Sequence, residues 1–587
     1  MRRDVADSCP APPEGPTRRV RSADGVSLAV YEHGDPARPT VVAVHGYPDN
    51  HAVWDGVVRL LADRYRVVTY DVRGTGESDK PRSVSAYRMP RLVDDFVAVI
   101  AAVSPDGPVH VLAHDWGSVQ CWPALTDTRT ASRVESFTSI SGPSLDYAAA
   151  WMRGAVQHPQ AALRQLRRSL YVAGFQLPVL PEAFVRSGLM RRAVHRTERR
   201  TRSAAGTAAV PPRTDADQVN GLALYRANML RGMGSPTPLP TRVPVQVIAP
   251  AQDAYVTPAL ALDSPRPWVE HLVTRTVAGG HWVVSDRPDV IARLTGEFIE
   301  SLGSAPPPDP PPRSGRFPGQ LVVVTGGARG IGRATALAFG RDGADVVVAD
   351  IDDAAAKETA DEIRALGVQA WAEHLDVSDE EQWTSFAADV RARHGVPDIV
   401  VNNAGIGMGG PFLGTSVDNW RTLLDVNLWG VIHGCRLFAA QMVERGEGGR
   451  IVNIASAAAY APSIVYPAYA TSKAAVLMLS ECLRAELERE GILVTAVCPG
   501  FVDSDISRTT VHVGVDEQTA QRLREHQIAA YHRRGYSPDR VARRLVDAVA
   551  DGAPTVIVTP EAKFFRAVSR FAPGLGRRLA KLDLNKL

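Results

Sequence analysis

Short apolar runs rich in β-branched residues recur along the chain and alternate with longer segments of helical character. Strands separated by helices predict a mostly parallel sheet. The alternation restarts near residue 318, where it predicts a second, doubly wound sheet. The fold class is therefore α/β, with two sheet domains on one chain. The predicted strands cover 41–44, 66–70, 109–112, 136–140 and 245–248 in the first half, and 321–324, 346–349, 399–401, 451–454, 494–497 and 555–558 in the second.

Two stretches interrupt the alternation. Residues 144–240 are rich in Arg, Leu and Tyr and place roughly 100 residues between two predicted strands, which predicts a helical cap inserted into the first domain. Residues 301–318 carry prolines at 306–308 and 310–312, which favour extended polyproline II. An interdomain spacer is preferred to a long loop or a ligand for a proline-binding module, because each side has a complete α/β pattern. The expected parts are domain 1–303, linker 304–317, domain 318–560 and tail 561–587.

Composition narrows the classes of function. The 587 residues are 45% hydrophobic and 22% charged, and 66 Lys and Arg against 64 Asp and Glu give no reason to expect nucleic acid as a partner. Five scattered cysteines without a C-x-x-C pair argue against a disulfide framework or a zinc site, and no metal is expected. The longest apolar runs are too short for a membrane span, and the start does not resemble a secretory signal. A cytoplasmic protein acting on small molecules is predicted.

The tail at 561–587 is basic and interleaved with aromatic and leucine residues. One interpretation is a segment that lies on a membrane surface or meets an amphiphilic substrate. The other is a C-terminal helix whose basic face is solvated and whose apolar face packs on its own domain. Its charged residues are Lys563, Arg566, Arg570, Arg577, Arg578, Lys581 and Lys586, against Glu561 and Asp583.

The first half contains a candidate nucleophile at a strand-to-helix turn. Ala113-His114-Asp115-Trp116-Gly117 follows a predicted strand and places small residues two positions either side of Asp115, the spacing of the elbow that exposes a nucleophile. An Asx-turn or a helix cap is the alternative for Asp115 alone. Asp253 and His281 follow at later strand exits, in the order acid then histidine, although a cap and a core histidine are their alternatives. Together the three predict a nucleophile–acid–histidine site.

Two further motifs make the resemblance specific: His45-Gly46-Tyr47-Pro48, and the segment DVRGTGES at 71–78. With the aspartate elbow, residues 20–300 resemble the α/β-hydrolase fold, and in particular its epoxide hydrolase branch. The resemblance implies that Asp115 forms an ester with the epoxide carbon, and that His281, oriented by Asp253, activates water. It further implies an oxyanion site made by the N–H groups of Tyr47 and Trp116, and two cap tyrosines, Tyr171 and Tyr225, that bind the epoxide oxygen. A haloalkane dehalogenase is the runner-up, although Tyr47 stands where such enzymes typically carry a halide-binding Asn.

The second half opens with a dinucleotide-binding pattern. The segment TGGARGIG at 325–332 lies between a predicted strand and a helix, where glycines let the backbone approach pyrophosphate. Asp350 closes the next strand, placed to bind ribose hydroxyls and to repel a 2′-phosphate, so NAD is favoured. Arg329 and Arg333 beside the loop could accept that phosphate, which leaves NADP open.

Downstream residues complete a second resemblance. Asn402-Asn403-Ala404-Gly405, Asn427, Ser456 and the pair Tyr469 and Lys473, one helical turn apart, follow in order. Residues 318–560 resemble the classical short-chain dehydrogenase/reductase family. This implies that Ser456 holds the substrate oxygen, Tyr469 moves its proton, Lys473 supports the phenolate and binds nicotinamide ribose, and Asn427 anchors a proton relay. The cofactor residues it implies are Gly326, Arg329, Gly330, Ile331, Gly332, Asp350, Asp376, Asn403, Ala404, Gly405, Tyr469, Lys473, Pro499, Gly500, Val502 and Ser504, the last where a Thr is usual.

The whole layout resembles actinobacterial fusions of an epoxide hydrolase with a short-chain dehydrogenase. Three hypotheses follow: a hydrolase whose diol feeds the dehydrogenase, two independent enzymes acting on lipid-like epoxides and alcohols or ketones, or a non-catalytic protein that responds to NAD. A working dehydrogenase joined to a vestigial hydrolase is a further alternative. The family also suggests a homo-oligomer formed through the dehydrogenase domain.

Overall fold

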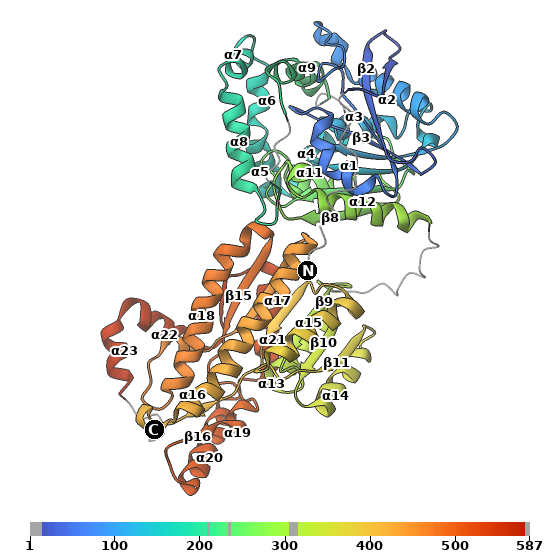
Figure 1. Cartoon of the computed structure of the whole chain (residues 1–587). Helices are drawn as coiled ribbons and strands as arrows, with labels where there is room; N and C mark the ends of the chain where they lie inside the picture. The colour runs from blue at the N-terminus through green and yellow to red at the C-terminus, as the bar shows by residue number, and fades with distance from the viewer. Residues whose placement is uncertain (1–14, 208–211, 233–235, 304–314, 582–587) are drawn as a thin grey trace. The chain divides into compact units, whose positions relative to one another are not determined.

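The computed structural model describes residues 15–207, 212–232, 236–303 and 315–581. The chain divides into two compact units, Met1–Pro306 and Pro307–Leu587 (Figure 1). Most of the predicted proline-rich linker lies outside the described residues, as do Asp583 and Lys586 of the predicted tail. Within the described ranges, no helix combines the length and apolar character needed to cross a bilayer.

The first unit is built on an eight-stranded sheet in the order β1-β2-β4-β3-β5-β6-β7-β8. The pairs β1–β2 and β2–β4 are antiparallel, and every other neighbouring pair is parallel. Each predicted strand is present, but β1, β2 and β8 were not predicted. Strand β8 is largely solvent-exposed at the sheet edge, so it lacks a strong apolar run. The strands are β1 (Arg18–Arg21), β2 (Ser27–His33), β3 (Thr40–Val44), β4 (Arg66–Tyr70), β5 (Val109–His114), β6 (Val134–Ile140), β7 (Val245–Pro250) and β8 (Leu272–Val277).

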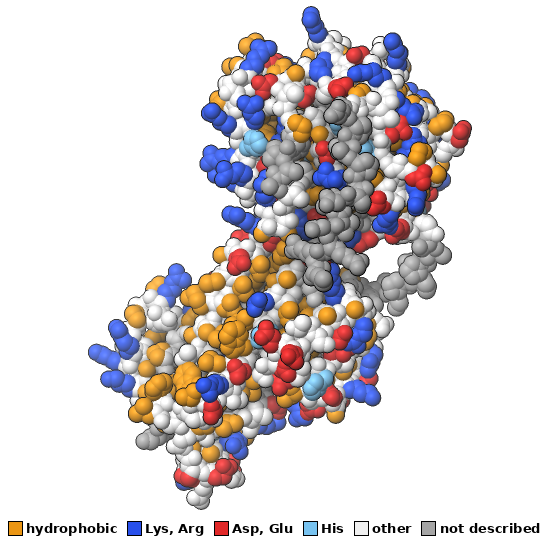
Figure 2. All heavy atoms as spheres, viewed as in Figure 1, with side chains coloured by type: hydrophobic (Ala, Val, Ile, Leu, Met, Phe, Trp, Pro, Cys, Tyr) orange, Lys and Arg blue, Asp and Glu red, His pale blue; other side chains and the backbone are white. Residues whose placement is uncertain are grey.

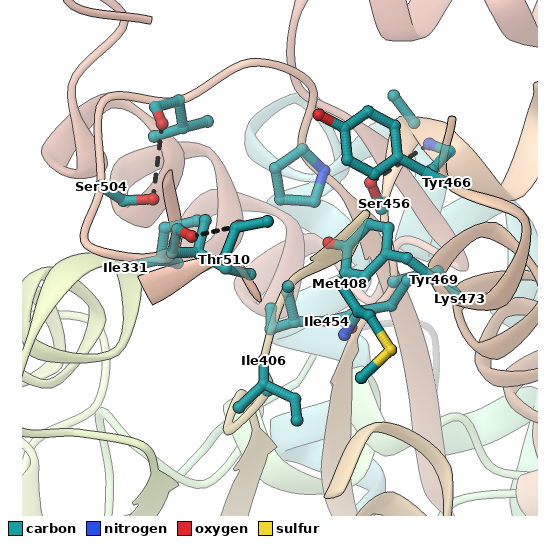
Figure 3. Close-up of a pocket in the computed structure, with 18 of the residues that line it drawn as sticks. Ile331, Ile406, Met408, Ile454, Ser456, Tyr466, Tyr469, Lys473, Ser504 and Thr510 are labelled. Atoms are coloured by element: carbon teal, nitrogen blue, oxygen red, sulfur yellow. Dashed lines mark hydrogen bonds between the residues drawn. The ribbon is translucent and has the colours of Figure 1, made fainter. Parts of the chain in front are cut away.

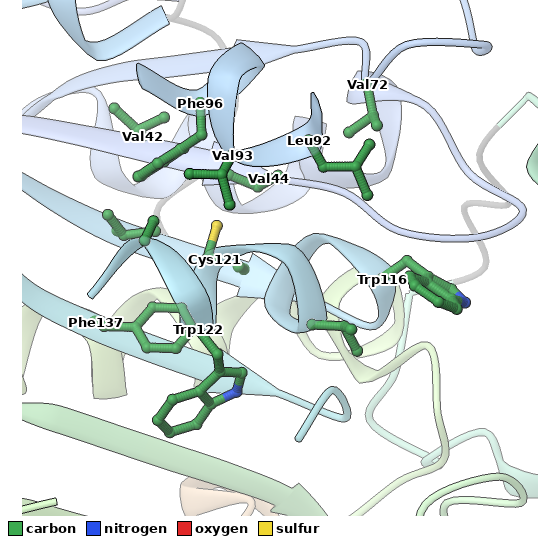
Figure 4. Packing of buried hydrophobic residues seen from close by; sticks show 14 of the residues in the cluster. Val42, Val44, Val72, Leu92, Val93, Phe96, Trp116, Cys121, Trp122 and Phe137 are labelled. Carbon is green, nitrogen blue, oxygen red and sulfur yellow. The ribbon is translucent and has the colours of Figure 1, made fainter. Parts of the chain in front are cut away.

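Helices cover both faces of this sheet. Helices α1 (Asp55–Leu61), α11 (Val283–Asp286) and α12 (Pro288–Gly303) contribute to the core on one face. Helices α2 (Met89–Val103) and α3 (Trp116–Ala124) pack on the other face. Figure 4 shows Phe96 of α2 beside Val42 of β3, with Cys121 of α3 below them. The buried cores on both sides hold β5 firmly, and β5 carries the turn that follows it.

A helical cap lies between β6 and β7, as the fold class predicts. Helices α6 to α8 gather on one side of this unit in Figure 1. The cap contributes Tyr225 and Leu222 to the same buried cluster as the sheet, so it is packed on the domain below it. The cap helices are α4 (Leu145–Arg153), α5 (Pro159–Arg168), α6 (Leu170–Phe175), α7 (Leu180–Arg186), α8 (Leu189–Thr201) and α9 (Asp215–Gly232).

The DVRGTGES segment at 71–78 is held by buried ion pairs and hydrogen bonds to neighbouring loops and helices. Arg73 is fully buried and pairs with Asp95 at 2.5 Å and Asp24 at 2.9 Å. Asp71 accepts hydrogen bonds from Tyr31 at 3.1 Å and from both the backbone and the ring of His51, at 2.9 and 2.8 Å. Because each buried charge has partners, the segment stabilises the fold without exposing its charges to the site.

The second unit is a doubly wound sheet of seven parallel strands in the order β11-β10-β9-β12-β14-β15-β17. Helices α13 (Gly330–Arg341), α14 (Asp353–Arg364) and α21 (Pro538–Asp551) cover one face. Helices α15 (Glu380–His394), α17 (Gly430–Arg445) and α18 (Pro467–Leu487) cover the other. The strands are β9 (Leu321–Thr325), β10 (Asp345–Asp350), β11 (Ala370–His374), β12 (Ile399–Asn402), β14 (Gly449–Ile454), β15 (Ile492–Cys498) and β17 (Thr555–Ile557).

Shorter elements surround the carboxyl ends of these strands. They are α16 (Val417–Leu424), a π-helical turn at Asp425–Trp429, a two-residue ribbon of β13 (Met408–Gly409) with β16 (Val511–His512), α19 (Ile506–Thr509) and α20 (Glu517–Arg534). The described part of the predicted tail forms α22 (Pro560–Phe571) and α23 (Pro573–Leu579). Ala562 and Val568 of α22 are buried, so this segment packs on its own domain as one of the two interpretations predicted.

Candidate active sites

Asp115 lies in the tight turn between β5 and α3. Its backbone has φ 49° and ψ −125°, a strained conformation for a residue other than glycine. Small residues allow the turn: a Cβ on Gly117 would lie 2.2 Å from the Val44 carbonyl oxygen, and one on Gly142 would lie 2.2 Å from that of Asp115. The spacing of small residues in the sequence therefore has a steric cause, and the turn presents the carboxylate at the end of β5.

The structure brings Asp115 together with the other two predicted members of the site. His281 Nε2 lies 3.6 Å from Asp115 Oδ1, and His281 Nδ1 lies 3.0 Å from Asp253 Oδ2. Asp253 Oδ1 also accepts the N–H groups of Tyr255 and Val256, at 2.8 and 3.0 Å. The carboxylate of Asp253 is thus fixed on one side by the backbone and on the other by the imidazole.

Two carboxylates set the charge of His281. Burial alone would lower its pKa, but the charges of Asp253 and Asp115 and the hydrogen bonds to them outweigh burial and raise the pKa to about 10. Burial likewise opposes ionisation of Asp253, and His281 with the two N–H groups lowers the pKa of Asp253 below its usual value. The site therefore holds a protonated imidazole between two carboxylates at neutral pH.

Backbone N–H groups approach the same carboxylate from the other side. The Tyr47 N–H donates a 2.8 Å hydrogen bond to Asp115 Oδ2. A Cβ on Gly46 would lie 2.5 Å from both Asp115 Oδ2 and the Trp116 nitrogen, so those two atoms share one corner of the site. This corner can stabilise negative charge on an oxygen of Asp115.

The two predicted cap tyrosines lie beside Asp115. The phenols of Tyr171 on α6 and Tyr225 on α9 share a hydrogen bond, and the charge of Asp115 acts on both. Burial is the largest cause that raises the pKa of each phenol far above its usual value; Asp115 comes next for Tyr171, whereas for Tyr225 the neighbouring Tyr171 comes before Asp115. Both phenols therefore remain protonated at neutral pH. Trp116 and Tyr47 pack edge-on against the Tyr225 ring, with centroids 5.0 and 5.4 Å apart.

Tyr255 is a member of this site that sequence reasoning missed. Its ring centroid lies 4.8 Å from that of His281 and 5.4 Å from that of Tyr171. It therefore links the imidazole to the cap tyrosine. Tyr255 stands two residues after Asp253 but belongs to no motif, so nothing in the sequence singled it out.

The second unit contains a cavity of about 970 Å³ at the carboxyl ends of its strands. Figure 3 shows Ser456, Tyr469 and Lys473 side by side within it. Of the predicted site residues, Gly332 and Asn427 do not line the cavity. The predicted residues that do are Gly326, Arg329, Gly330, Ile331, Asp350, Asp376, Asn403, Ala404, Gly405, Ser456, Tyr469, Lys473, Pro499, Gly500, Val502 and Ser504.

The glycine-rich turn fits a dinucleotide for steric reasons. Gly326 and Gly330 have φ of 61° and 54°. A Cβ on Gly332 would lie 1.9 Å from the Gly326 carbonyl oxygen, so Gly332 lets the helix pack on the turn. At Gly330, by contrast, the nearest atom to a Cβ would be Ser504 Cβ at 3.5 Å, so a side chain there would project into the cavity. Asn403 braces the turn through its amide, which donates to the carbonyls of Thr325 and Gly326 at 2.9 and 3.0 Å.

The charges near the end of β10 bear on the choice of cofactor. Asp350 lines the cavity, and its Oδ2 accepts the Ala328 N–H at 3.0 Å. Arg329 pairs with Asp352 at 2.5 Å, and Arg333 pairs with Glu362. Both arginines that could meet a 2′-phosphate are therefore already paired with carboxylates.

Burial dominates the ionisation of the Tyr469–Lys473 pair. It raises the pKa of Tyr469 to about 12, against a hydrogen bond with Ser456 that lowers it. It also lowers the pKa of Lys473 to about 8. The ammonium donates to the Ile454 carbonyl at 3.0 Å and lies 5.9 Å from the Tyr469 ring centroid. In this geometry the hydrogen bond with Ser456 favours the phenolate.

Asn427 lies behind the cavity wall. The π-helical turn places its Oδ1 2.8 Å from the Ile406 N–H, and its amide donates to the Ile406 carbonyl at 3.0 Å. A Cβ on Gly405 would lie 3.1 Å from Asn427 Oδ1 and 3.3 Å from Lys473 Nζ. Gly405 therefore leaves a narrow space where Asn427 and Lys473 approach each other.

Several residues that line this cavity were not predicted from the sequence. Tyr466 and Tyr531 line it, and Tyr531 on α20 is close enough for its charge to act on Tyr469. Gln527, one turn before, donates to the Tyr531 hydroxyl at 3.5 Å. Helices α22 and α23 also contribute side chains to the lining. None of these positions belongs to a motif: Tyr466 stands just before α18, and the residues of α20, α22 and α23 reach the cavity only through the folding of distant segments.

Comparisons with known proteins agree with this architecture. Residues 39–288 match the model of the alpha/beta hydrolase fold, and residues 320–512 match that of short chain dehydrogenase. EphD of Mycobacterium tuberculosis, which carries the name probable oxidoreductase, is 44% identical over 590 residues, covering 96% of this chain and 98% of its own. The chain belongs to the EphD family.

Members of the EphD family thus join an α/β-hydrolase unit to a short-chain dehydrogenase on one chain, and the predicted fusion is confirmed. The C alpha-dehydrogenase of a Sphingobium species is 32% identical over 258 residues, covering 42% of this chain and 83% of its own. A solved short-chain dehydrogenase/reductase of Burkholderia phymatum, in complex with NAD, is 29% identical and covers 45% of this chain and 96% of its own, with a TM-score of 0.41. This EphD-family chain is an oxidoreductase fused to an α/β-hydrolase, and its second unit uses a nicotinamide cofactor and a small-molecule substrate.

Proposed function

We propose that the first unit hydrolyses epoxides to vicinal diols and that the second is an NAD-dependent oxidoreductase for an alcohol or carbonyl compound. One observation carries the first assignment. A carboxylate that is contacted by His281 on one side and by the Tyr47 N–H on the other lies beside two protonated phenols, Tyr171 and Tyr225. A carboxylate nucleophile facing hydrogen-bond donors suits a strained C–O bond whose oxygen must be protonated as it opens.

The first step forms an ester. Asp115 attacks an epoxide carbon, the C–O bond breaks, and the oxygen that leaves takes a proton from the Tyr171–Tyr225 pair. The product is a 2-hydroxyalkyl ester of Asp115 with a phenolate in the cap. High pKa values make these phenols weak acids but strong stabilisers of the opening oxygen, since they donate to it throughout the step.

The second step hydrolyses that ester. Ester formation removes the negative charge of Asp115, one of the two charges that hold the pKa of His281 near 10. The pKa of His281 then falls, so the imidazolium gives up its proton, which restores the cap phenol, and the neutral imidazole accepts a proton from the water that attacks Asp115 Cγ. The N–H groups of Tyr47 and Trp116 stabilise the oxyanion. Cleavage of the ester bond releases the diol and restores the carboxylate.

The dehydrogenase step uses residues already inside the cavity. A nicotinamide cofactor, when bound, accepts or supplies the hydride. Gly326, Gly330 and the first turn of α13 would hold its pyrophosphate, and Asp350 its adenosine ribose. Ser456 donates a hydrogen bond to the substrate oxygen, and Tyr469 exchanges the proton of the carbinol hydroxyl. Lys473, whose pKa is lowered to about 8, is placed to hold the ribose and to pass that proton onward.

Diol formation tests the hydrolase. The full-length protein should convert an aryl or long-chain epoxide to a diol, detected by mass spectrometry, and Asp115→Asn should lower the rate by at least about 10³-fold because the nucleophile is lost. Asp63→Asn, an exposed carboxylate after α1, is the matched control and should retain full activity. Diol formation that survives Asp115→Asn would refute the ester mechanism, and turnover of haloalkanes alone would assign a dehalogenase.

Cofactor affinity tests the preference for NAD. The fluorescence of bound NADH should give a dissociation constant at least about tenfold lower than that of NADPH, because Asp350 repels the 2′-phosphate. Asp350→Asn should narrow this ratio by removing the charge, whereas Asp361→Asn on the exposed side of α14 should leave it unchanged. Tighter binding of NADPH by the unaltered protein would reverse the assignment.

A further inference from the structure

Helices α22 and α23 form part of the wall of the dehydrogenase cavity. The side chains that they contribute to the lining are all apolar, and one glycine contributes its backbone. The Glu561 carboxylate accepts the Phe501 N–H at 2.9 Å, and the Ile464 N–H donates to the Ala580 carbonyl at 3.3 Å, so both ends of this helical pair are attached to the cavity rim. The lining residues of the pair are Phe564, Phe565, Val568, Gly576, Leu579 and Ala580.

The outer side of the same helical pair is strongly basic. Six exposed cations lie between 560 and 581, and none of them pairs with a described carboxylate. The one carboxylate of this segment, Glu561, lies 3.7 Å from Arg534 and already accepts the Phe501 N–H. In Figure 2 blue side chains gather over the edge of the second unit where α22 and α23 lie. The six cations are Lys563, Arg566, Arg570, Arg577, Arg578 and Lys581.

Large apolar side chains are exposed among these cations. Phe571 is 80% exposed, Phe564 51% and Leu575 45%. Arg570 lies over the Phe571 ring, with its guanidinium carbon 5.8 Å from the centroid. Unpaired basic groups interleaved with exposed aromatic and leucine side chains suit the headgroup region of a bilayer, where the cations meet anionic headgroups and the apolar groups insert. An acidic protein partner would pair with the cations but would not bury the exposed ring of Phe571.

We propose that the α22–α23 pair docks the dehydrogenase unit on an anionic lipid bilayer and that a lipophilic alcohol or ketone enters the cavity along its apolar inner side. The docking rests on the charge and exposure of the helical pair alone. The choice of substrate rests on the proposed oxidoreductase function. Since one side of the pair lines the cavity and the other meets the bilayer, a substrate dissolved in the membrane has a short apolar path to Tyr469.

Vesicle sedimentation tests the docking. Full-length protein should sediment with vesicles of equal phosphatidylglycerol and phosphatidylcholine, at least tenfold more strongly than with phosphatidylcholine alone, and salt should weaken the binding. The triple variant Arg570→Gln, Arg577→Gln, Arg578→Gln should lose at least tenfold in affinity, and Phe571→Ser should lose severalfold at unchanged charge. The matched control, Arg522→Gln, Arg543→Gln, Arg544→Gln, removes three exposed cations from α20 and α21 and should bind as the unaltered protein does.

Several outcomes would overturn the proposal. They are equal binding to both vesicle types, unchanged binding by the triple variant, equal loss in the control, or no effect of Phe571→Ser. Self-association that the triple variant abolishes, without vesicle binding, would assign the surface to a second copy of the chain. NADH affinity should stay the same in every variant, which shows that each one folds.

Substrate delivery is tested separately. The triple variant should form NADH more slowly from 2-hexadecanol in anionic vesicles, and at the unaltered rate from 2-butanol in solution. Equal rates on both alcohols for variant and unaltered protein would overturn the delivery route. If the unaltered protein oxidises neither alcohol, it is the oxidoreductase assignment that fails for this substrate class, and sedimentation alone decides the docking.

Discussion

His281 is held between Asp115 and Asp253, and both carboxylates raise its pKa. The folded pKa of about 10 lies above the ordinary value of 6.5, so the unfolded chain binds fewer protons at neutral and alkaline pH. The contribution of these contacts to the stability of the first unit is therefore fully present below pH 6.5 and is lost as the pH rises toward 10. Lys473 acts in the opposite sense: burial lowers its folded pKa to about 8, so its ammonium destabilises the folded second unit below pH 8, and this penalty is relieved as the pH rises from 8 to 10.5.

Thermal unfolding at two pH values tests this difference. Between pH 7 and 9.5 the first unit should lose about 5 °C or more in melting temperature, and His281→Asn should remove most of this loss because no imidazolium remains to titrate. Added NADH, which raises the second transition, identifies the two units. Lys473→Met is the matched control, which should leave the pH dependence of the first unit intact. An equal fall in His281→Asn would show that other groups dominate.

The order of Asp115, Asp253 and His281 along the chain was enough to predict that they meet, because the carboxyl ends of parallel strands lie at one edge of a sheet. Tyr255 and Tyr531 were not predictable in this way. Tyr255 lacks a motif of its own, and Tyr531 reaches the cavity only because α20 folds over it. Predictions from motifs therefore covered the candidate catalytic residues and omitted Tyr255 and Tyr531, which line the two sites.

At the scale of elements, the packing of α3 against β3 decides whether the elbow can form. Strands buried on both sides gave clear apolar runs and were predicted within about two residues of their ends. The edge strands β1, β8 and β11, which are partly exposed, were missed, and so was the inner strand β2, although most of its residues are buried. Packing of the tail on its own domain was one of the two interpretations of its sequence, but the part that α22 and α23 take in the cavity wall was not predicted, because local sequence does not reveal that contact.

Gly117→Ala tests the close approach of α3 to β3. The added methyl would lie 2.2 Å from the Val44 carbonyl oxygen, a backbone atom that cannot move aside cheaply, so we expect a loss of about 1–3 kcal/mol in the free energy of unfolding. Diol formation should fall as well, since the turn that carries Asp115 would shift. Gly174→Ala in α6 is the control: nothing lies within 4 Å of its added methyl, and helix propensity should make it neutral or slightly stabilising. Urea unfolding and product analysis measure both; similar results for the two variants would contradict the steric argument.

On the scale of the whole molecule, each unit has its own core and its own candidate site. Tyr469→Phe should lower alcohol oxidation by about 10²-fold or more and leave diol formation unchanged, because it removes the group that accepts the carbinol proton in the second unit alone. Asp115→Asn should leave NADH affinity unchanged. Any effect of one variant on the other activity would show coupling between the sites.

A single incubation then decides whether the activities form one pathway. With an epoxide and NAD⁺, NADH that appears only after the diol would place the dehydrogenase downstream of the hydrolase. Diol without NADH would indicate two enzymes with separate substrates. NADH binding without turnover of any alcohol would favour a protein that senses the cofactor.

The insertion of the cap between β6 and β7 has a kinetic consequence for the first unit. Ile140 of β6 pairs with Ile248 of β7 only after the intervening cap, roughly 100 residues, has been closed into a loop, and such long-range pairing is slow. The elbow, by contrast, consists of consecutive residues. We therefore expect Asp115 to meet Asp253 and His281 late in folding, only after the cap has been closed into its loop.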